Sequence, residues 1–163
     1  MLVESRVTTR ELLHAIQAER ARFEATLARL TAEQILAPGA DGPWSVKDII
    51  VHISYWERDL LRRLSGQGRP GAPTDSVNER VFQANRASPL EVVMAEFDAS
   101  YRALMSRLVE LSDEELNRPP FYRPWQPRPL WRDVASETYE HYWEHTEPLR
   151  VWLAKTARGR RAA

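Results

Sequence analysis

Cysteine is absent from this chain of 163 residues. Its absence excludes disulfide bonds, thiolate ligands for a metal ion and a cysteine nucleophile. Long apolar runs are missing as well, since no stretch approaches the roughly 20 residues that a helix needs to cross a bilayer. The segment after Met1 is polar and charged and lacks the features of a secretory signal, so we expect a cytoplasmic protein with no membrane partner.

An excess of charge of one sign is also lacking. Lys and Arg together number 23, Asp and Glu together number 23, and the formal net charge is zero. Proteins that bind nucleic acid usually carry a basic excess or a basic face. Only a short tail at 158–161 is basic here, so the sequence predicts no nucleic-acid partner.

No long stretch of the chain alternates apolar and polar residues as a β-strand would. Apolar residues recur instead at three- and four-residue steps. This spacing predicts four long helices, at 9–30, 45–64, 89–111 and 130–157. The first of them presents the stripe Leu13, Ile16, Phe23, Leu27 and Leu30. The predicted fold is therefore all-α, a four-helix bundle in a single domain 1–163 with a frayed basic tail at 158–163.

The connections between these helices differ in character. A short helical turn is expected within 30–42, and a partly helical connection at 74–87 follows the glycine- and proline-rich loop 65–73. The loop 117–129 holds five prolines together with aromatic residues and arginines, so it is neither helix nor central strand. The bundle should thus have long connections after its second and third helices.

Two helix starts carry capping residues. Ser45 is a candidate N-cap with Asp48 in the first turn, and Ser88 is a second candidate, followed by Pro89 and by Glu91 to complete a capping box. The segments ARLTAEQIL and VELSDEEL, which follow the first and third helices, resemble each other. This echo favours two helical hairpins of common design.

Three of the four histidines fall on apolar faces of predicted helices. His141 and His145 are four residues apart in YEHYWEH and so share one face, and His52 shares a face with Ile49 and Trp56. Burial of three imidazoles costs free energy unless their nitrogens are bonded, and a divalent ion would satisfy all three. Buried packing histidines without a metal are the alternative. His14 lies beside the first apolar stripe and is left out of the site.

The chain resembles a known family in the segments WSVKDIIVHISYWE at 44–57 and ETYEHYWEH at 137–145. Together with LTAEQ, DGPWSVKDI, SPLEVV and LSDEEL, these resemble the DinB superfamily and its ClbS/DfsB-like branch. The resemblance implies a four-helix bundle with a divalent metal, Zn, Ni, Fe or Mn, bound by His52, His141 and His145. It also implies hydrolase or thiol S-transferase chemistry, with a low-molecular-weight thiol as cosubstrate in some members, and it allows a homodimer.

Residues near the predicted ligands are candidates for further roles. Asp48 and Glu137 lie one turn before His52 and His141 and are candidate catalytic carboxylates, as partners of the histidines or, for Glu137, as a general base. Solvated helix carboxylates are the alternative reading. The candidate substrate-binding residues, each with a structural alternative, are Trp56, Tyr55, Tyr142 and, in the proline-rich loop, Trp125.

Two functional hypotheses follow from this resemblance. In the first, the protein is a metal-dependent enzyme that acts on a small electrophilic molecule, as a hydrolase or a thiol transferase in detoxification or self-resistance. In the second, the same site binds or sequesters a small molecule or metal without turnover. A bundle with buried histidines and no metal is a third, purely structural reading.

Overall fold

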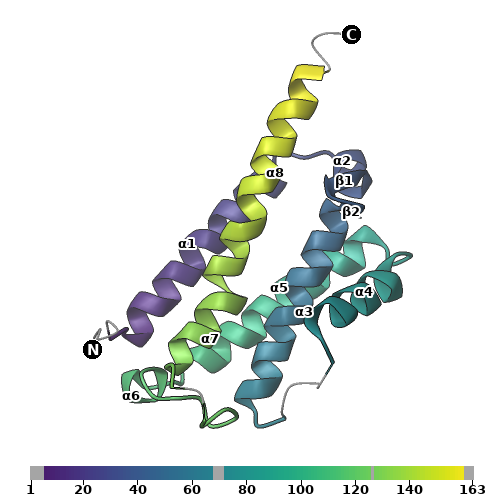
Figure 1. The fold of residues 1–163 in the computed structure, drawn as a ribbon. Helices are drawn as coiled ribbons and strands as arrows, with labels where there is room; N and C mark the ends of the chain where they lie inside the picture. The colour runs from purple at the N-terminus through teal and green to yellow at the C-terminus, as the bar shows by residue number, and fades with distance from the viewer. Residues whose placement is uncertain (1–5, 68–71, 126, 160–163) are drawn as a thin grey trace.

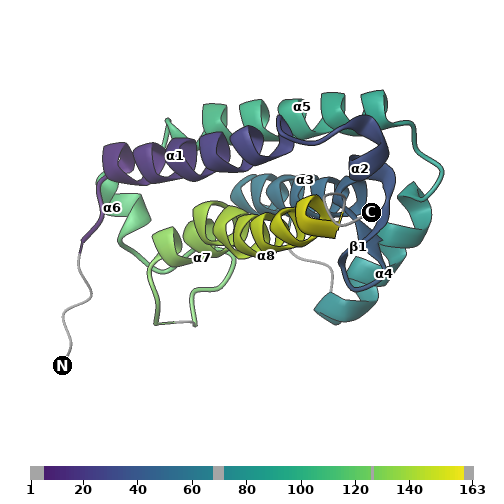
Figure 2. The same cartoon turned by 90° about the horizontal axis from the view of Figure 1, so that it is seen from above.

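The computed structural model describes residues 6–67, 72–125 and 127–159, and it confirms an all-α bundle. Its long helices are α1 (Thr9–Leu27), α3 (Val46–Leu64), α5 (Leu90–Leu108) and α8 (Tyr139–Gly159), with α7 (Leu130–Glu137) preceding α8. Figure 2 shows α1 and α5 in one layer and α3 with α7 and α8 in the other. The closest packing joins α3 to α5 and α1 to α8.

Across the described ranges, none of the helices combines the length and the apolar character of a membrane span.

Short elements fill the connections. The segments of the echo form α2 (Ala32–Leu36) and α6 (Asp113–Leu116), each opened by a capping box, Thr31 with Gln34 and Ser112 with Glu115. The connection after α3 contains α4 (Thr74–Asn85), which confirms its predicted helical character. A small antiparallel hairpin of β1 (Pro38–Asp41) and β2 (Trp44–Ser45) was not predicted, because strands this short show no alternation.

The predicted cap of α3 is confirmed, and that of α5 is wrong. Ser45 caps α3 and Asp48 completes its capping box. At α5 the N-cap is Pro89, and Ser88 makes no capping bond. The turn before α5 is held instead by the Lys47 ammonium, which donates to the carbonyls of Asn85, Arg86 and Ser88 at 3.3, 2.8 and 3.1 Å. A side chain from α3 thus fixes the carbonyl groups of this turn, which is a different task from the N-cap role predicted for Ser88.

The fourth helix is broken where one continuous helix was predicted. Thr138 separates α7 from α8 with φ −129° and ψ −102°. Its hydroxyl donates to the carbonyl of Val134 at 2.6 Å, and its backbone N–H bonds the carbonyl of Ala135. The Thr138 N–H thus bonds the carbonyl three residues back instead of that of Val134, and the regular helical ladder stops here. Part of the predicted frayed tail, 158–159, lies in α8, and 160–163 lie outside the described residues.

A buried polar network joins all four long helices. Glu57 of α3 is fully buried and accepts hydrogen bonds from Tyr142 of α8 and Ser100 of α5. The guanidinium of Arg20, on α1, lies 3.9 Å from the same carboxylate. Burial raises the pKa of Glu57, and the surrounding donors only partly oppose this. The predicted α1 stripe missed Arg20, which is 3 % exposed, while Leu13 and Leu30 are only half-buried.

A second buried network ties α3 to α7. Arg63 is 1 % exposed, and its guanidinium forms ion pairs with Asp59 at 2.9 Å and Glu137 at 2.6 Å. Asp133 lies 3.9 Å from it and also accepts from Arg128 at 2.6 Å and from the Tyr122 hydroxyl at 3.1 Å. Through Arg128 and Tyr122, this network therefore also holds the proline-rich loop against the N-terminal part of α7.

Replacing Arg63 with alanine should destabilise the fold strongly. The change leaves the carboxylates of Asp59 and Glu137 without their buried cation, which costs about 3–5 kcal/mol. Arg58→Ala is a matched control on the same helix, since Arg58 pairs with Glu96 at the surface, and there the loss should be below about 1 kcal/mol. Urea unfolding followed by circular dichroism measures both, and equal losses would contradict the assigned role of Arg63.

Candidate metal centre

Three histidines from two helices converge between α3 and α8. His52 comes from α3, and His141 and His145 come from the first turns of α8. The Nε2 atoms of His52 and His141 lie 2.8 Å apart, and one nitrogen from each of the three rings lies within 4.8 Å of the others. The three ring centroids are 4.8–5.1 Å apart. The structure thus brings together the three residues that the sequence predicted as ligands.

The local structure explains how α8 presents its two histidines. The break at Thr138 starts a new helix, so His141 lies in its first turn and His145 one turn later on the same face. The carbonyl of Thr138 accepts the Tyr142 N–H at 2.8 Å and secures this turn. The phenol of Tyr142 bonds Glu57, which fixes α8 against α3. Helix phase and this central bond together aim both imidazoles at His52.

The imidazoles of the cluster are held neutral. Burial lowers the pKa of His52 to about 3, with a further contribution from His145. Burial also lowers the pKa of His141, with contributions from both neighbours, and that of His145, which Asp41 partly opposes. A lowered pKa favours the neutral form of each imidazole at neutral pH, in which one ring nitrogen has a lone pair available to a cation.

The chemistry of the donors fits a divalent transition metal. Neutral imidazole nitrogens suit zinc, nickel and iron. The Nδ1 atom of His141 is buried and has no hydrogen-bond partner among the described residues. A buried polar atom without a partner costs free energy in a merely packed cluster. Three imidazole nitrogens that lie within 4.8 Å of one another offer such an ion a set of donors.

Aromatic side chains wall the cluster on the α3 side. Trp44 lies 5.2 Å from His52 between ring centroids and stacks on Phe82 of α4 at 6.1 Å. Trp56 lies 6.3 Å from His52, edge to face, and its indole N–H donates to Asn78 at 3.0 Å. Sequence reasoning named Trp56 but missed Trp44, Phe82 and Asn78. Phe82 and Asn78 lie on α4, which carries no signal that it folds over α3, and Trp44 lies in the hairpin that was not predicted.

The two predicted catalytic carboxylates are engaged elsewhere in the fold. Asp48 accepts from the backbone N–H and the hydroxyl of Ser45, at 2.8 and 2.6 Å, and so caps α3. Glu137 forms its ion pair with Arg63. In sequence, each lies one turn before a predicted metal ligand, His52 or His141.

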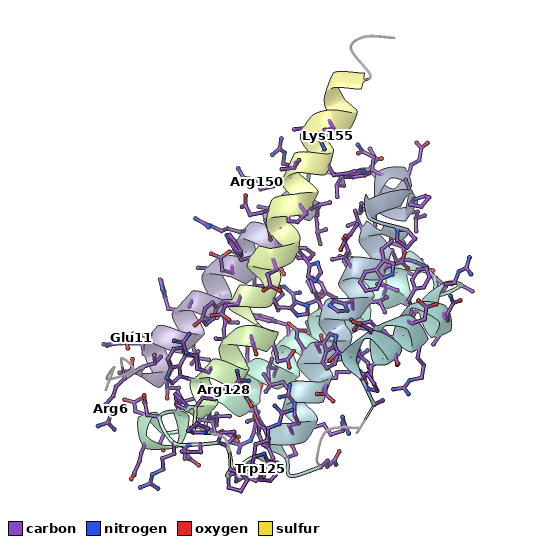
Figure 3. All side chains as sticks on the ribbon, in the orientation of Figure 1. Arg6, Glu11, Trp125, Arg128, Arg150 and Lys155 are labelled. Carbon is purple, nitrogen blue, oxygen red and sulfur yellow. The ribbon has the colours of Figure 1, made fainter. Side chains whose placement is uncertain are left out.

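The remaining predicted substrate residues are dispersed. Tyr55 packs edge to face on Trp56 at 5.3 Å, and the hydroxyl of Tyr142 points to Glu57 inside the bundle. Trp125 is 77 % exposed on the proline-rich loop. Figure 3 places it with Arg128 at the end of the molecule where that loop lies. The structure therefore brings Trp56 to the histidines, whereas Trp125 lies exposed on the proline-rich loop.

Several solved structures share this fold. The colibactin self-resistance protein ClbS, in complex with double-stranded DNA, is 17 % identical with a TM-score of 0.74, covering 91 % of this chain and 95 % of that one. DfsB, a sibling lethal factor precursor, is 16 % identical with a TM-score of 0.79, covering 93 % and 98 %. A protein from Streptococcus pneumoniae is 12 % identical with a TM-score of 0.73, covering 94 % of each. No curated protein matches the chain.

The sequence predicted that this protein has no nucleic-acid partner, and that prediction is wrong. ClbS, which has the same fold, is seen with double-stranded DNA, so this fold cannot be taken to exclude such a partner. Net charge averages over the whole surface and does not report how charges are distributed. In this neutral chain the segment 117–132 carries four arginines and neither Asp nor Glu. Composition alone was therefore an inadequate basis for that prediction.

The sequence itself matches the family model of the DinB superfamily over residues 15–148. That range covers most of the chain and includes all three histidines of the cluster. Among the structural neighbours, ClbS and DfsB match the branch that the sequence motifs indicated. The chain therefore belongs to the DinB superfamily.

Proposed function

We propose that this protein is a divalent-metal-dependent enzyme that acts on a small electrophilic molecule. One observation carries the proposal, namely that three neutral imidazoles from α3 and α8 place their nitrogens within 4.8 Å of one another. Three protein ligands are typical of catalytic zinc sites, which keep a coordination position open, whereas structural sites close with four. Zinc, nickel, iron and manganese are all candidates for this donor set.

A divalent ion bound by His52, His141 and His145 would lower the pKa of a bound water or thiol and so supply a nucleophile near neutral pH. Water as nucleophile corresponds to a hydrolase, and a low-molecular-weight thiol corresponds to an S-transferase. The name of ClbS, a self-resistance protein, supports a protective reaction of this kind.

The residues around the cluster have separate tasks in this proposal. Trp44, Phe82 and Trp56 exclude water on the α3 side and contact the apolar part of a substrate. Asp48 and Glu137, predicted as catalytic groups, instead hold the helices that carry the ligands, through the α3 cap and the Arg63 pair. Tyr142 holds α8 in place through Glu57.

Loss of any ligand should abolish metal binding. Tag-free wild type should carry roughly one transition-metal ion per chain, and His52→Ala, His141→Ala and His145→Ala should each lose it, because two imidazoles bind far more weakly than three. Elemental analysis measures the content, with circular dichroism to verify helicity. His14→Ala is the matched control, since His14 is an exposed histidine of α1.

A wild type that stays empty after incubation with zinc, nickel, iron and manganese at neutral pH would overturn the proposal. If metal binds, hydrolysis and thiol-transfer assays on electrophilic substrates separate the enzyme from its alternative, a protein that binds or sequesters a small molecule or metal. Turnover that disappears in the histidine variants supports the enzyme, and stoichiometric capture without turnover supports the alternative.

A second candidate function is contact with nucleic acid. The observation in its favour is that ClbS is seen with double-stranded DNA. In this chain Arg118 and Arg123 lie in a segment with no acidic residue, together with the exposed aromatic side chains of Phe121 and Trp125. Arg118 pairs with Glu114 of α6, and both side chains of this pair are exposed, so a phosphate would replace that carboxylate. Arginine is the side chain best suited to bind phosphate through paired hydrogen bonds. We propose that this end of the bundle is the face that would contact a duplex.

The double variant Arg118→Ala/Arg123→Ala tests this candidate. If both guanidinium groups contact phosphate, duplex affinity should fall and the slope of log K against log salt should decrease by about one per arginine. Fluorescence anisotropy with a labelled duplex measures both quantities. Arg150→Ala is the control, because Arg150 lies toward the opposite end of the molecule (Figure 3). Absence of binding by wild type at low salt would exclude this second function.

A further inference from the structure

Trp44 lies where the β-hairpin meets α3, next to the histidine cluster. In the antiparallel pair of β1 and β2 it is the partner of Asp41, and the next residue, Ser45, is the N-cap of α3. Figure 1 shows this hairpin at the start of α3, and α4 alongside α3. The backbone of Trp44 is therefore held both by strand pairing and by the helix cap that follows it.

The indole of Trp44 joins His52 to α4 through a series of ring contacts. Its centroid lies 5.2 Å from that of His52, with the two ring planes at 51°. The same indole stacks on Phe82, with centroids 6.1 Å apart and ring planes at 21°. The guanidinium carbon of Arg86 lies 5.7 Å from the Phe82 centroid. Stacked and tilted rings attract one another at such separations, and the arginine adds a cation–π contact, so the series of contacts reaches the end of α4.

The helix that carries Phe82 is itself fastened to α3 at two points. The Trp56 indole N–H donates to the Asn78 Oδ1 at 3.0 Å. The Lys47 ammonium donates to three backbone carbonyls at the end of α4 and in the turn that follows it. Phe82 lies between these two points in the sequence, so the ring that supports Trp44 has a fixed place beside α3.

The rotation of the His52 ring decides whether this residue can act as a ligand. Its Nε2 lies 2.8 Å from the Nε2 of His141. The last torsion angle of a histidine side chain is broad and roughly two-fold, so packing must select the rotation. A half-turn would bring Cε1 to the place of Nε2 and remove the ligand atom. His52 is 9 % exposed, and the indoles of Trp44 and Trp56 lie 5.2 and 6.3 Å from it between ring centroids.

We propose that Trp44 is a positioning residue, whose indole, supported by Phe82, holds the His52 ring in the rotation that presents Nε2 to the other two histidines. The inference rests on the proposed metal site and deepens it. It gives the hairpin and α4, which lie outside the four long helices, a task in that site. Groups that orient a metal ligand without touching the ion commonly change metal affinity 10- to 100-fold when they are lost.

The first test measures Zn²⁺ affinity by competition with a chromogenic chelator. Trp44→Leu removes the ring beside His52 and should weaken zinc binding about 10-fold, the lower end of the range for groups that orient a ligand. Trp44→Phe keeps an aromatic ring there and should restore most of the affinity. Trp143→Leu is the control, because Trp143 is 53 % exposed and lies two residues from both His141 and His145, on the opposite face of α8. Its zinc affinity should equal that of wild type.

The second test observes the His52 ring itself and needs no metal. Carbon-13 relaxation of labelled imidazoles in the metal-free protein gives an order parameter for each histidine ring. That of His52 should be about 0.85, the value of a rigid group, in wild type and in Trp44→Phe, and it should fall below about 0.6 in Trp44→Leu. The exposed ring of His14 is the internal control, since its order parameter should be the same in all three proteins.

A third variant tests the support of the indole. Phe82→Leu leaves Trp44 in place but removes the ring on which it stacks. Zinc affinity and the His52 order parameter should both fall in this variant, by less than in Trp44→Leu.

The outcomes separate the two proposals. Zinc binding by wild type with equal affinity in Trp44→Leu, or an unchanged His52 order parameter, would overturn the role of Trp44 and leave the metal site intact. An empty wild type would overturn the metal site, and the order parameters would still decide the role of Trp44. If Trp44→Leu fails to fold, the decision passes to Phe82→Leu, where losses in zinc affinity and ring order support the inference and wild-type values contradict it.

Discussion

The hydrogen bond between Tyr142 and Glu57 is the contact on which the geometry of the site depends. It joins α8 to α3 at the centre of the bundle, where Glu57 is fully buried. His141 precedes Tyr142 directly, and His52 lies five residues before Glu57 on α3. A rotation or slide of either helix would break this bond and separate the histidines. Because burial makes an unpaired carboxylate costly, the network admits one alignment of the two helices.

The position of α3 explains why so much of the chemistry gathers on it. Of its 19 residues 14 are buried, because α5, α4, α7, α8 and the hairpin all pack around it. One side carries Glu57 toward α1 and α5, another carries His52 toward α8, and its last turn carries Arg63 toward α7. A central helix with polar side chains on several faces must find partners for each, which constrains every helix around it.

The distribution of charge along the chain explains why overall composition was a poor basis for predicting nucleic-acid partners. Positive and negative residues balance over the chain, yet the arginines of 117–132 occur without an acidic residue among them. Asp133 accepts from Arg128, and Glu114 forms an ion pair with Arg118, so part of this charge is neutralised by neighbours in the fold. The electrostatic character of a surface therefore depends on which of these pairs form, and a sum over the sequence contains no such information.

Local rules were enough to predict several features. Helical periodicity determined that His141 and His145 share a face and that His52 points inward, and capping chemistry determined the start of α3. These properties depend on residues within a few positions of one another. The partners of Arg63, Lys47 and Asn78 were decided only by the tertiary structure, because each lies on a separate segment whose approach no local pattern records. The same holds for the carboxylates of Asp48 and Glu137. Each lies one turn from a histidine of the cluster in sequence, but capping and a buried arginine determine what they bind.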